Sequence, residues 1–239
     1  MTSMYAERAG LYDRIYHWKD YAGEATRLRE LLRAEGLTDG ARVLDAACGT
    51  GSHLAHLRAW YDVAGFDRSE DMLAVARGKL PGVHLWRAEL TGVAVERPYD
   101  ATLCLFSSIG YLTDEAGLRA AARALAGTVR PGGVLLVEPW LEAASYTVGK
   151  PSLATYTSPE LCLARASVAA REGELSISDM HWLVAPAGGE VERFSERHVL
   201  WLCPRPVLVA AFQAAGLEAR LEEAGLMKDR GLLIARKPA

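Results

Sequence analysis

The sequence has few cysteines, and none of them forms a C-x-x-C pair. The 239 residues include only Cys48, Cys104, Cys162 and Cys203, which lie far apart. This usage is not that of a disulfide framework and favours a reducing, cytoplasmic compartment. The N-terminus has no secretory signal pattern, and no apolar run is long enough to cross a bilayer.

The chain also lacks an excess of charge of one sign. Its formal net charge is −3, so the composition points neither to a nucleic acid nor to an anionic membrane surface as a partner. Internal repeats and low-complexity segments are absent too. Half of the residues are hydrophobic, which is enough for a sizeable core. We therefore expect one α/β domain with a small appended part.

The first glycine-rich loop does not read G-x-G-x-x-G, the turn that binds dinucleotides. A short apolar strand from Arg42 leads into a loop of small residues, and a helical pattern follows over Ser52–Trp60. In an open α/β sheet this place receives ligands, because small residues let the backbone approach and the helix start offers free N–H groups. The expected contacts are Asp45, Ala47, Cys48, Gly49 and Gly51.

The first half of the chain alternates strand-like and helix-like segments, which predicts a parallel sheet with helices on its faces. The predicted strands are 43–44, 62–67, 83–86, 99–106 and 134–138, with a turn at 131–133. The predicted helices are 21–35, 72–77 and 118–129. Ser69 is the expected N-cap of the second of these helices.

The pattern changes after residue 140. Three alternating segments, Leu161–Ala170, Leu175–Val184 and Glu192–Trp201, are separated by Gly173 and the Gly188-Gly189 pair, which predicts an antiparallel insertion.

A helix over 205–215 and two strands, 217–222 and 231–236, close the chain. We divide it into lid helices and a ligand-binding core (1–140), the antiparallel insertion (141–203), and the last helix and strands (204–239).

Asp67 ends the second predicted strand, about 20 residues after the glycine loop. An acidic side chain there can accept hydrogen bonds from both ribose hydroxyls of a nucleotide ligand. The alternative is an ordinary surface carboxylate that starts the next helix. A nicotinamide site would share this residue, so Asp67 alone does not separate the two ligands.

The end of the fourth predicted strand carries a cluster of apolar and hydroxyl side chains. Residues at such a strand end face the ligand crevice. Leu105 and Phe106 are expected beside the cofactor, and the hydroxyls of Ser107, Ser108 and Tyr111 are candidates to orient a nucleophile. The alternative is that two serines after a strand are ordinary turn chemistry.

The loop sequence D-x-x-C-G-T-G, from Asp45 to Gly51, resembles motif I of the class I methyltransferases that use S-adenosyl-L-methionine (SAM). The family usually has glycine where Ala47 stands. The resemblance implies a Rossmann-like seven-stranded sheet, SAM as cofactor and S-adenosyl-L-homocysteine as product. It also implies that Glu89 takes the adenine amino group and that Leu90 packs on the adenine ring. Its position makes Met72 a candidate for the adenine face, although methionine is more often core filling.

Several further segments are similar to one branch of that superfamily, the TDP-amino-sugar N,N-dimethyltransferases. They are Leu11–Arg14, Lys19–Tyr21, Phe106–Gly110, Val137–Trp140, Met180–Ala185 and Arg230–Leu232. The branch implies transfer of a methyl group to the amine of a small molecule, most simply a nucleotide-linked amino sugar. We expect the antiparallel insertion to lie over the acceptor and to pair two subunits as a homodimer.

The same resemblance assigns roles to aromatic and basic side chains. It implies that Tyr12 and Tyr21 help to hold SAM and that Tyr5 reaches the acceptor amine. Without it, tyrosines of a first helix would be expected to pack that helix on the sheet. The expected catalytic set is Tyr5, Ser108 and Tyr111. The expected substrate contacts are Trp140, Arg165, Ser167, His181 and Arg230.

His53 and His56 are three residues apart on a predicted helix, but no third ligand is near in sequence, so we expect no metal. Three departures from the branch fall on the acceptor side. Tyr111 replaces a histidine, Leu141 replaces a tryptophan, and Arg165–Ala169 replaces R-V-S-H-S. Three alternatives therefore remain: O-, N- or C-methylation of another small molecule, a non-catalytic SAM-binding protein, and a nicotinamide dehydrogenase.

Overall fold

The computed structural model describes the backbone of residues 3–239 and the side chains of residues 9–239. The first part of the chain alternates helices and strands. These elements are α1 (Ser3–Ile15), α2 (Tyr21–Ala34), β1 (Arg42–Ala46), α3 (Ser52–Leu57), β2 (Asp62–Asp67), α4 (Glu70–Lys79), β3 (His84–Arg87), β4 (Tyr99–Cys104), η1 (Ser108–Tyr111), α5 (Glu115–Thr128) and β5 (Val129–Val137).

Four long strands follow, and then one helix and two short strands. They are β6 (Pro151–Thr157), β7 (Leu161–Glu172), β8 (Leu175–Pro186), β9 (Glu192–Trp201), α6 (Arg205–Ala214), β10 (Glu218–Glu222) and β11 (Leu232–Arg236). No helix within the described residues is long and apolar enough to cross a membrane.

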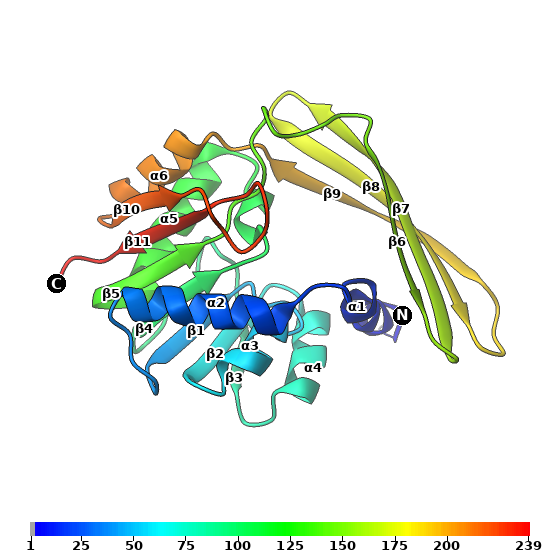
Figure 1. The fold of residues 1–239 in the computed structure, drawn as a ribbon, viewed down its shortest axis with the longest axis horizontal. Coiled ribbons are helices and arrows are strands. Elements are labelled where there is room, and N and C mark those ends of the chain that lie inside the picture. The colour runs from blue at the N-terminus through cyan, green and yellow to red at the C-terminus, as the bar shows by residue number, and fades with distance from the viewer. Residues whose placement is uncertain (1–2) are drawn as a thin grey trace.

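The main sheet has seven strands in the order β10-β11-β5-β4-β1-β2-β3. Strands β1 to β5 run parallel, and β11 is antiparallel to both β5 and β10. The predicted seven-stranded sheet is therefore confirmed. Neighbouring residues of its strands face opposite sides: Leu44 packs toward α5 and α6, whereas Val43 packs toward α2, α3 and α4. Figure 1 shows these helices on the two sides of the sheet.

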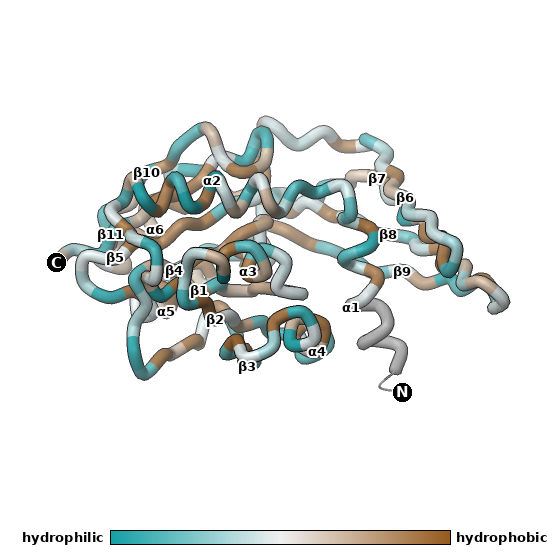
Figure 2. The backbone as a smooth tube through the Cα atoms, turned by 60° about the horizontal axis from the view of Figure 1, so that its bottom comes forward, coloured by the Kyte–Doolittle hydropathy of each residue, from teal (hydrophilic) through white to brown (hydrophobic). Residues whose placement is uncertain are grey.

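The insertion forms a second, antiparallel sheet in the order β6-β7-β8-β9. It extends away from the main sheet, and α1 lies against the face of the second sheet that is turned toward the main sheet (Figure 1). Ile15 of α1 is fully buried against Leu163 of β7 and Trp182 of β8, in a small cluster separate from the two main cores. Along the main-sheet helices the backbone alternates polar and apolar residues, as expected for surface helices (Figure 2).

Two local predictions were wrong. The sequence Pro131-Gly132-Gly133 lies inside β5 and not in a turn before it. The register between β4 and β5 shifts there, and a side chain at position 133 would come within 2.7 Å of the carbonyl oxygen of Asp100. Proline and glycine thus mark an irregularity within the strand. The insertion also has a fourth strand, β6, which the three predicted segments did not include.

Candidate active site

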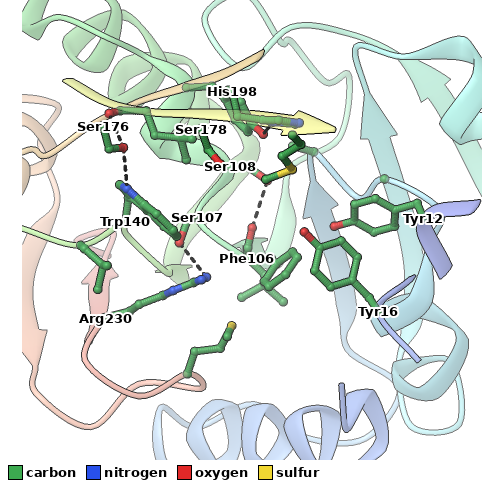
Figure 3. A pocket seen from close by; sticks show the side chains of 18 of the residues that line it. Tyr12, Tyr16, Phe106, Ser107, Ser108, Trp140, Ser176, Ser178, His198 and Arg230 are labelled. Carbon is green, nitrogen blue, oxygen red and sulfur yellow. Dashed lines mark hydrogen bonds between the residues drawn. The ribbon is translucent and has the colours of Figure 1, made fainter. Parts of the chain in front are cut away.

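A cavity of about 490 Å³ lies where the carboxyl ends of β1 and β4 meet α1 and the inner face of the second sheet. Figure 3 shows its aromatic wall, with Tyr12 and Tyr16, facing a polar wall with Ser178 and His198. Its volume falls in the range of small-molecule sites in proteins. The cavity therefore has two sides, one built by the main sheet and one by the insertion.

The loop after β1 forms the main-sheet side. Asp45, Ala47, Cys48 and Gly49 line the cavity, and their contacts with a ligand stay predictions. Ala47 has a φ of 59°, in the left-handed region that favours glycine. Gly51 does not line the cavity but is the N-cap of α3, with a φ of 73°. A side chain at position 51 would lie 2.5 Å from the Leu80 side chain, so glycine at this position allows the loop to pack closely on α4.

Asp67 holds this loop in place. Its Oδ2 atom accepts a hydrogen bond from the backbone N–H of Gly49 at 2.9 Å, and Oδ1 accepts one from Ser69 at 2.8 Å. The hydroxyl of Ser69 caps α4 by accepting from the N–H of Met72 at 3.3 Å. The cap prediction is thus confirmed. Asp67 is not among the residues that line the cavity, and its ribose role stays a prediction.

The two carboxyl groups beside the loop are deeply buried. Asp45 is 2% exposed, and burial together with nearby Asp67 raises the pKa of Asp45 to about 8. Burial also raises the pKa of Asp67. Burial penalises the charged form of the Asp45 carboxyl group. A cation bound in the cavity would favour the ionised carboxylate again. SAM carries a sulfonium and an ammonium, so these residues fit that cofactor.

Three residues predicted at the adenine end lie away from the cavity wall. Glu89 is exposed, Leu90 packs against the main core, and Met72 is half-buried on the first turn of α4. None of them lines the cavity. Their adenine contacts remain predictions.

The loop after β4 is held by a residue whose role the sequence did not reveal. Glu138 is fully buried and accepts hydrogen bonds from the backbone N–H groups of Phe106 at 2.7 Å and Met227 at 3.0 Å. Phe106 and Ser107 both have positive φ angles, 52° and 62°. In the sequence the V-E-P-W segment indicates only a resemblance, whereas in the fold its carboxylate joins two loops of the cavity wall.

Aromatic rings form the wall next to that loop. Tyr12 and Tyr16 have ring centroids 4.6 Å apart, and Tyr16 packs edge-on against Phe106 at 5.2 Å. Tyr12 and Tyr21 line the cavity, their contacts with SAM stay predictions, and Tyr16 beside them was missed. Tyr5 lies in α1, and its side chain is outside the described part of the chain. Such π faces suit a cationic ligand.

A buried ion network lies below these rings. Lys19 is paired with Glu24, and the other carboxylate oxygen of Glu24 is 2.7 Å from Nε2 of His53. The Lys19 ammonium also lies 4.5 Å from the centre of the Phe106 ring. His53 is therefore engaged in an ion network. Within the described residues no group of histidine, cysteine, aspartate and glutamate is arranged to hold a metal.

Two arginines line the cavity, Arg165 from β7 of the insertion and Arg230 from the loop before β11 of the main sheet. Arg165 donates a hydrogen bond to the hydroxyl of Tyr16 at 3.0 Å, and Arg230 donates to the hydroxyl of Ser107 at 3.0 Å. Burial lowers the pKa of Arg230, a penalty that an anionic ligand would relieve. Trp140 stacks near Arg230, with the guanidinium 4.7 Å from its ring centre (Figure 3).

The other predicted substrate contacts divide between the two faces of the second sheet. Ser167 lines the cavity, two residues along β7 from Arg165. His181 is exposed and is not among the cavity residues, because its neighbours Met180 and Trp182 occupy the inner side of β8. The structure therefore brings Ser167 to the site and leaves His181 on the outer face.

The hydroxyls predicted to act in catalysis differ in their partners. Ser108 donates its hydroxyl proton to the carbonyl oxygen of Leu105 at 3.0 Å, a hydrogen bond within its own loop. The Tyr111 hydroxyl lies 2.6 Å from Nδ1 of His198. His198 comes from β9 in the insertion and was missed, because its partner is 87 residues away in sequence.

Comparison with known proteins connects this geometry to a family. Residues 43–133 match the family described as "Methyltransferase domain". The dTDP-3-amino-3,4,6-trideoxy-alpha-D-glucopyranose N,N-dimethyltransferase of Streptomyces venezuelae is 36% identical over 231 residues, covering 95% of this chain and 97% of the relative.

Solved structures agree over the same span. The crystal structure of DesVI from Streptomyces venezuelae superimposes with a TM-score of 0.90 at 36% identity, covering 97% of this chain and 98% of that one. SAM-bound CalS10, an amino pentose methyltransferase from Micromonospora echinaspora, gives 0.85 at 33% identity, covering 95% and 96%. The chain therefore belongs to the family of TDP-amino-sugar N,N-dimethyltransferases, within the class I methyltransferases that use S-adenosyl-L-methionine as cofactor.

Proposed function

We propose that this enzyme transfers a methyl group from SAM to the amine of a TDP-linked amino sugar. The observation that carries the proposal is the division of one cavity into two chemically different sides. Buried Asp45 and the aromatic wall suit the cationic cofactor, whereas Arg165 and Arg230 suit the diphosphate of a nucleotide. A nicotinamide dehydrogenase finds no support, since the loop lacks the dinucleotide sequence and the relatives are methyltransferases.

Bound SAM supplies a methyl group on a positively charged sulfur, which leaves as a neutral sulfide. The protein's part is to align the acceptor amine and to exclude water, which supplies roughly 7–11 kcal/mol in the best-oriented systems. Asp45, the 47–49 backbone and Asp67 would hold the cofactor, with Tyr12 and Tyr21 over it. Tyr111 at the end of η1 would orient the amine, and Arg165, Ser167, Trp140 and Arg230 would hold the nucleotide sugar.

We further propose that the enzyme is a cytoplasmic homodimer that pairs through the insertion. All four cysteines are free thiols, as a reducing compartment requires. Leu153, Val168 and Leu183 lie on the outer face of the second sheet and are 69%, 57% and 46% exposed. A second copy that covers this apolar face would bury them. Sedimentation analysis should give a dimer, and a Leu153→Glu, Leu183→Glu double variant should give a monomer.

Calorimetric titration tests the proposal for the ligands. SAM and S-adenosyl-L-homocysteine should each bind at micromolar concentration, and TDP should bind separately to the cofactor complex. Binding of SAM without any response to TDP would indicate that the methyl acceptor is a different small molecule. Absence of SAM binding would overturn the proposal for the whole cavity.

A further inference from the structure

Three side chains from two distant segments form a continuous chain that starts at the cavity. The Tyr111 hydroxyl is 2.6 Å from Nδ1 of His198, and the Nε2 atom of the same imidazole lies 3.2 Å from Oε1 of Glu196. Nε2 is buried and makes no aligned hydrogen bond, so its contact with Glu196 is one of charge and distance. Trp182 holds the carboxylate by donating its indole N–H to Oε1 at 2.9 Å.

We propose that this chain, Tyr111–His198–Glu196, takes the proton from the acceptor ammonium so that the amine attacks as a free base. The proposal rests on the proposed function, because it needs an amine in the cavity. Tyr111 would touch the amine. His198 and Glu196 act through Tyr111 and are positioning and proton-accepting residues behind it.

The chemistry of the acceptor makes such a chain useful. An aliphatic ammonium keeps its proton at neutral pH, as the lysine ammonium does. A protonated nitrogen has no lone pair and cannot attack. A secondary ammonium formed by a first methylation must also lose a proton before a second methylation. Each transfer in a dimethylation thus requires the loss of one proton, and an acceptor beside the nitrogen lets that loss occur within the closed site.

The proton passes along the three residues and then leaves to solvent. The ammonium N–H passes its proton to Tyr111 Oη as the phenol passes its own proton to His198 Nδ1. The imidazolium that forms is stabilised by the Glu196 carboxylate and returns its proton to solvent after the transfer. The freed nitrogen lone pair forms the new N–C bond, and the electrons of the broken C–S bond stay on sulfur.

The surroundings keep Tyr111 and Glu196, the two ends of the chain, in the required states. Burial raises the pKa of Tyr111 to about 12, with Tyr16 and Glu196 adding to the rise and Arg68 and Arg165 opposing it, so the phenol stays protonated. Burial alone would raise the pKa of Glu196, but the His198 ring, Trp182 and Arg165 lower it below its ordinary value. Glu196 is therefore a carboxylate across the neutral range.

Variants that keep the shape and remove proton transfer test the chain. His198→Gln retains a hydrogen-bonding side chain beside Tyr111 but cannot become a cation. The acceptor probe is TDP-3-amino-3,4,6-trideoxy-α-D-glucose, the amine of the Streptomyces venezuelae relative's named substrate. Near neutral pH we expect kcat to fall by about 100-fold or more with little change in KM. At a pH above the amine's own titration, the variant should match the wild type.

Glu196→Gln should show the same pH dependence with a smaller loss, and both variants should accumulate monomethylated product at neutral pH. The matched controls are His56→Gln on the exposed side of α3 and Glu192→Gln at the start of β9. Both controls should follow the wild-type profile. A His198→Gln loss that is equal at every pH, or that lies in KM alone, would overturn the proposal.

A spectroscopic measurement on the complex with S-adenosyl-L-homocysteine gives a readout without turnover. The imidazole ¹⁵N shifts of His198 should move toward those of an imidazolium when the amine probe is added, and should stay unchanged in Tyr111→Phe. Unmoved shifts in an active wild-type enzyme would contradict the chain of proton transfer. A wild-type enzyme that methylates no amine would instead overturn the proposed function.

Discussion

The two sides of the cavity are built in different ways. The cofactor side is local: Asp45, the 47–51 loop and Asp67 lie within about one βαβ unit, and Gly49 and Asp67 are joined by a direct hydrogen bond. The acceptor side is assembled from distant segments: Arg165 reaches Tyr16 of the aromatic wall, 149 residues away, and Tyr111 contacts His198, 87 residues away. A short motif can encode the first side, whereas only the folded insertion creates the second.

The largest expected effect comes from removing Glu138, whose carboxylate joins two loops of the cavity wall. In a Glu138→Ala variant the N–H groups of Phe106 and Met227 lose their acceptor. We expect the free energy of unfolding to fall by about 3–4 kcal/mol, since each unsatisfied buried group costs about 1–3 kcal/mol. Chemical denaturation measures this change, and binding of both ligands should weaken. The exposed Glu96→Ala is the control, and an equal loss there would contradict the role of Glu138.

Asp67→Ala should break the cofactor side alone. The loop loses the acceptor for Gly49, and the expected ribose contacts disappear. Kd for SAM should rise about 100-fold, or about 3 kcal/mol. Titration should show TDP binding unchanged. The comparison variant is Asp62→Ala at the exposed start of β2, which should bind SAM normally. A loss of TDP binding in Asp67→Ala would show that the two sides are not independent.

Arg165→Ala should break the acceptor side alone. Removal of a guanidinium that contacts Tyr16 and lines the cavity should raise KM for the TDP-sugar about 10- to 30-fold, with Kd for SAM unchanged. Steady-state kinetics with the acceptor varied measures the effect. Arg193→Ala, on an exposed part of β9, should leave KM as it is. An unchanged KM in Arg165→Ala would remove this arginine from the acceptor site.

The smallest expected effect is a change in stability from a substitution at Ala47 in the cofactor loop. Ala47→Gly should raise the free energy of unfolding by about 0.5–1 kcal/mol, because glycine adopts a φ of 59° without strain. Ala55→Gly, in the exposed interior of α3, should change stability by a similar amount in the opposite direction. Thermal unfolding of the two variants should therefore move in opposite directions, and a loss in both would contradict the strain at Ala47.

The same division explains what could be predicted from sequence. The βα units, the seven strands and the loop residues from Asp45 to Gly49 follow local patterns of apolar and small residues, and they were predicted. The hydrogen bonds of Glu138 to Phe106 and Met227 and the contact of His198 with Tyr111 join distant segments, and they were not predicted. The strand β6 was also missed, although it pairs with its neighbour β7 in a local hairpin. His181 shows the limit most clearly: its strand was predicted, but which of its two faces meets the cavity was not.

The central claim is that the two sides meet to methylate a sugar amine. The most direct measurement is mass spectrometry of TDP-3-amino-3,4,6-trideoxy-α-D-glucose incubated with the enzyme and SAM. The account predicts products carrying one and then two methyl groups, located on nitrogen by fragmentation, with matching formation of S-adenosyl-L-homocysteine. An unchanged sugar in the presence of an enzyme that binds both SAM and TDP would contradict it.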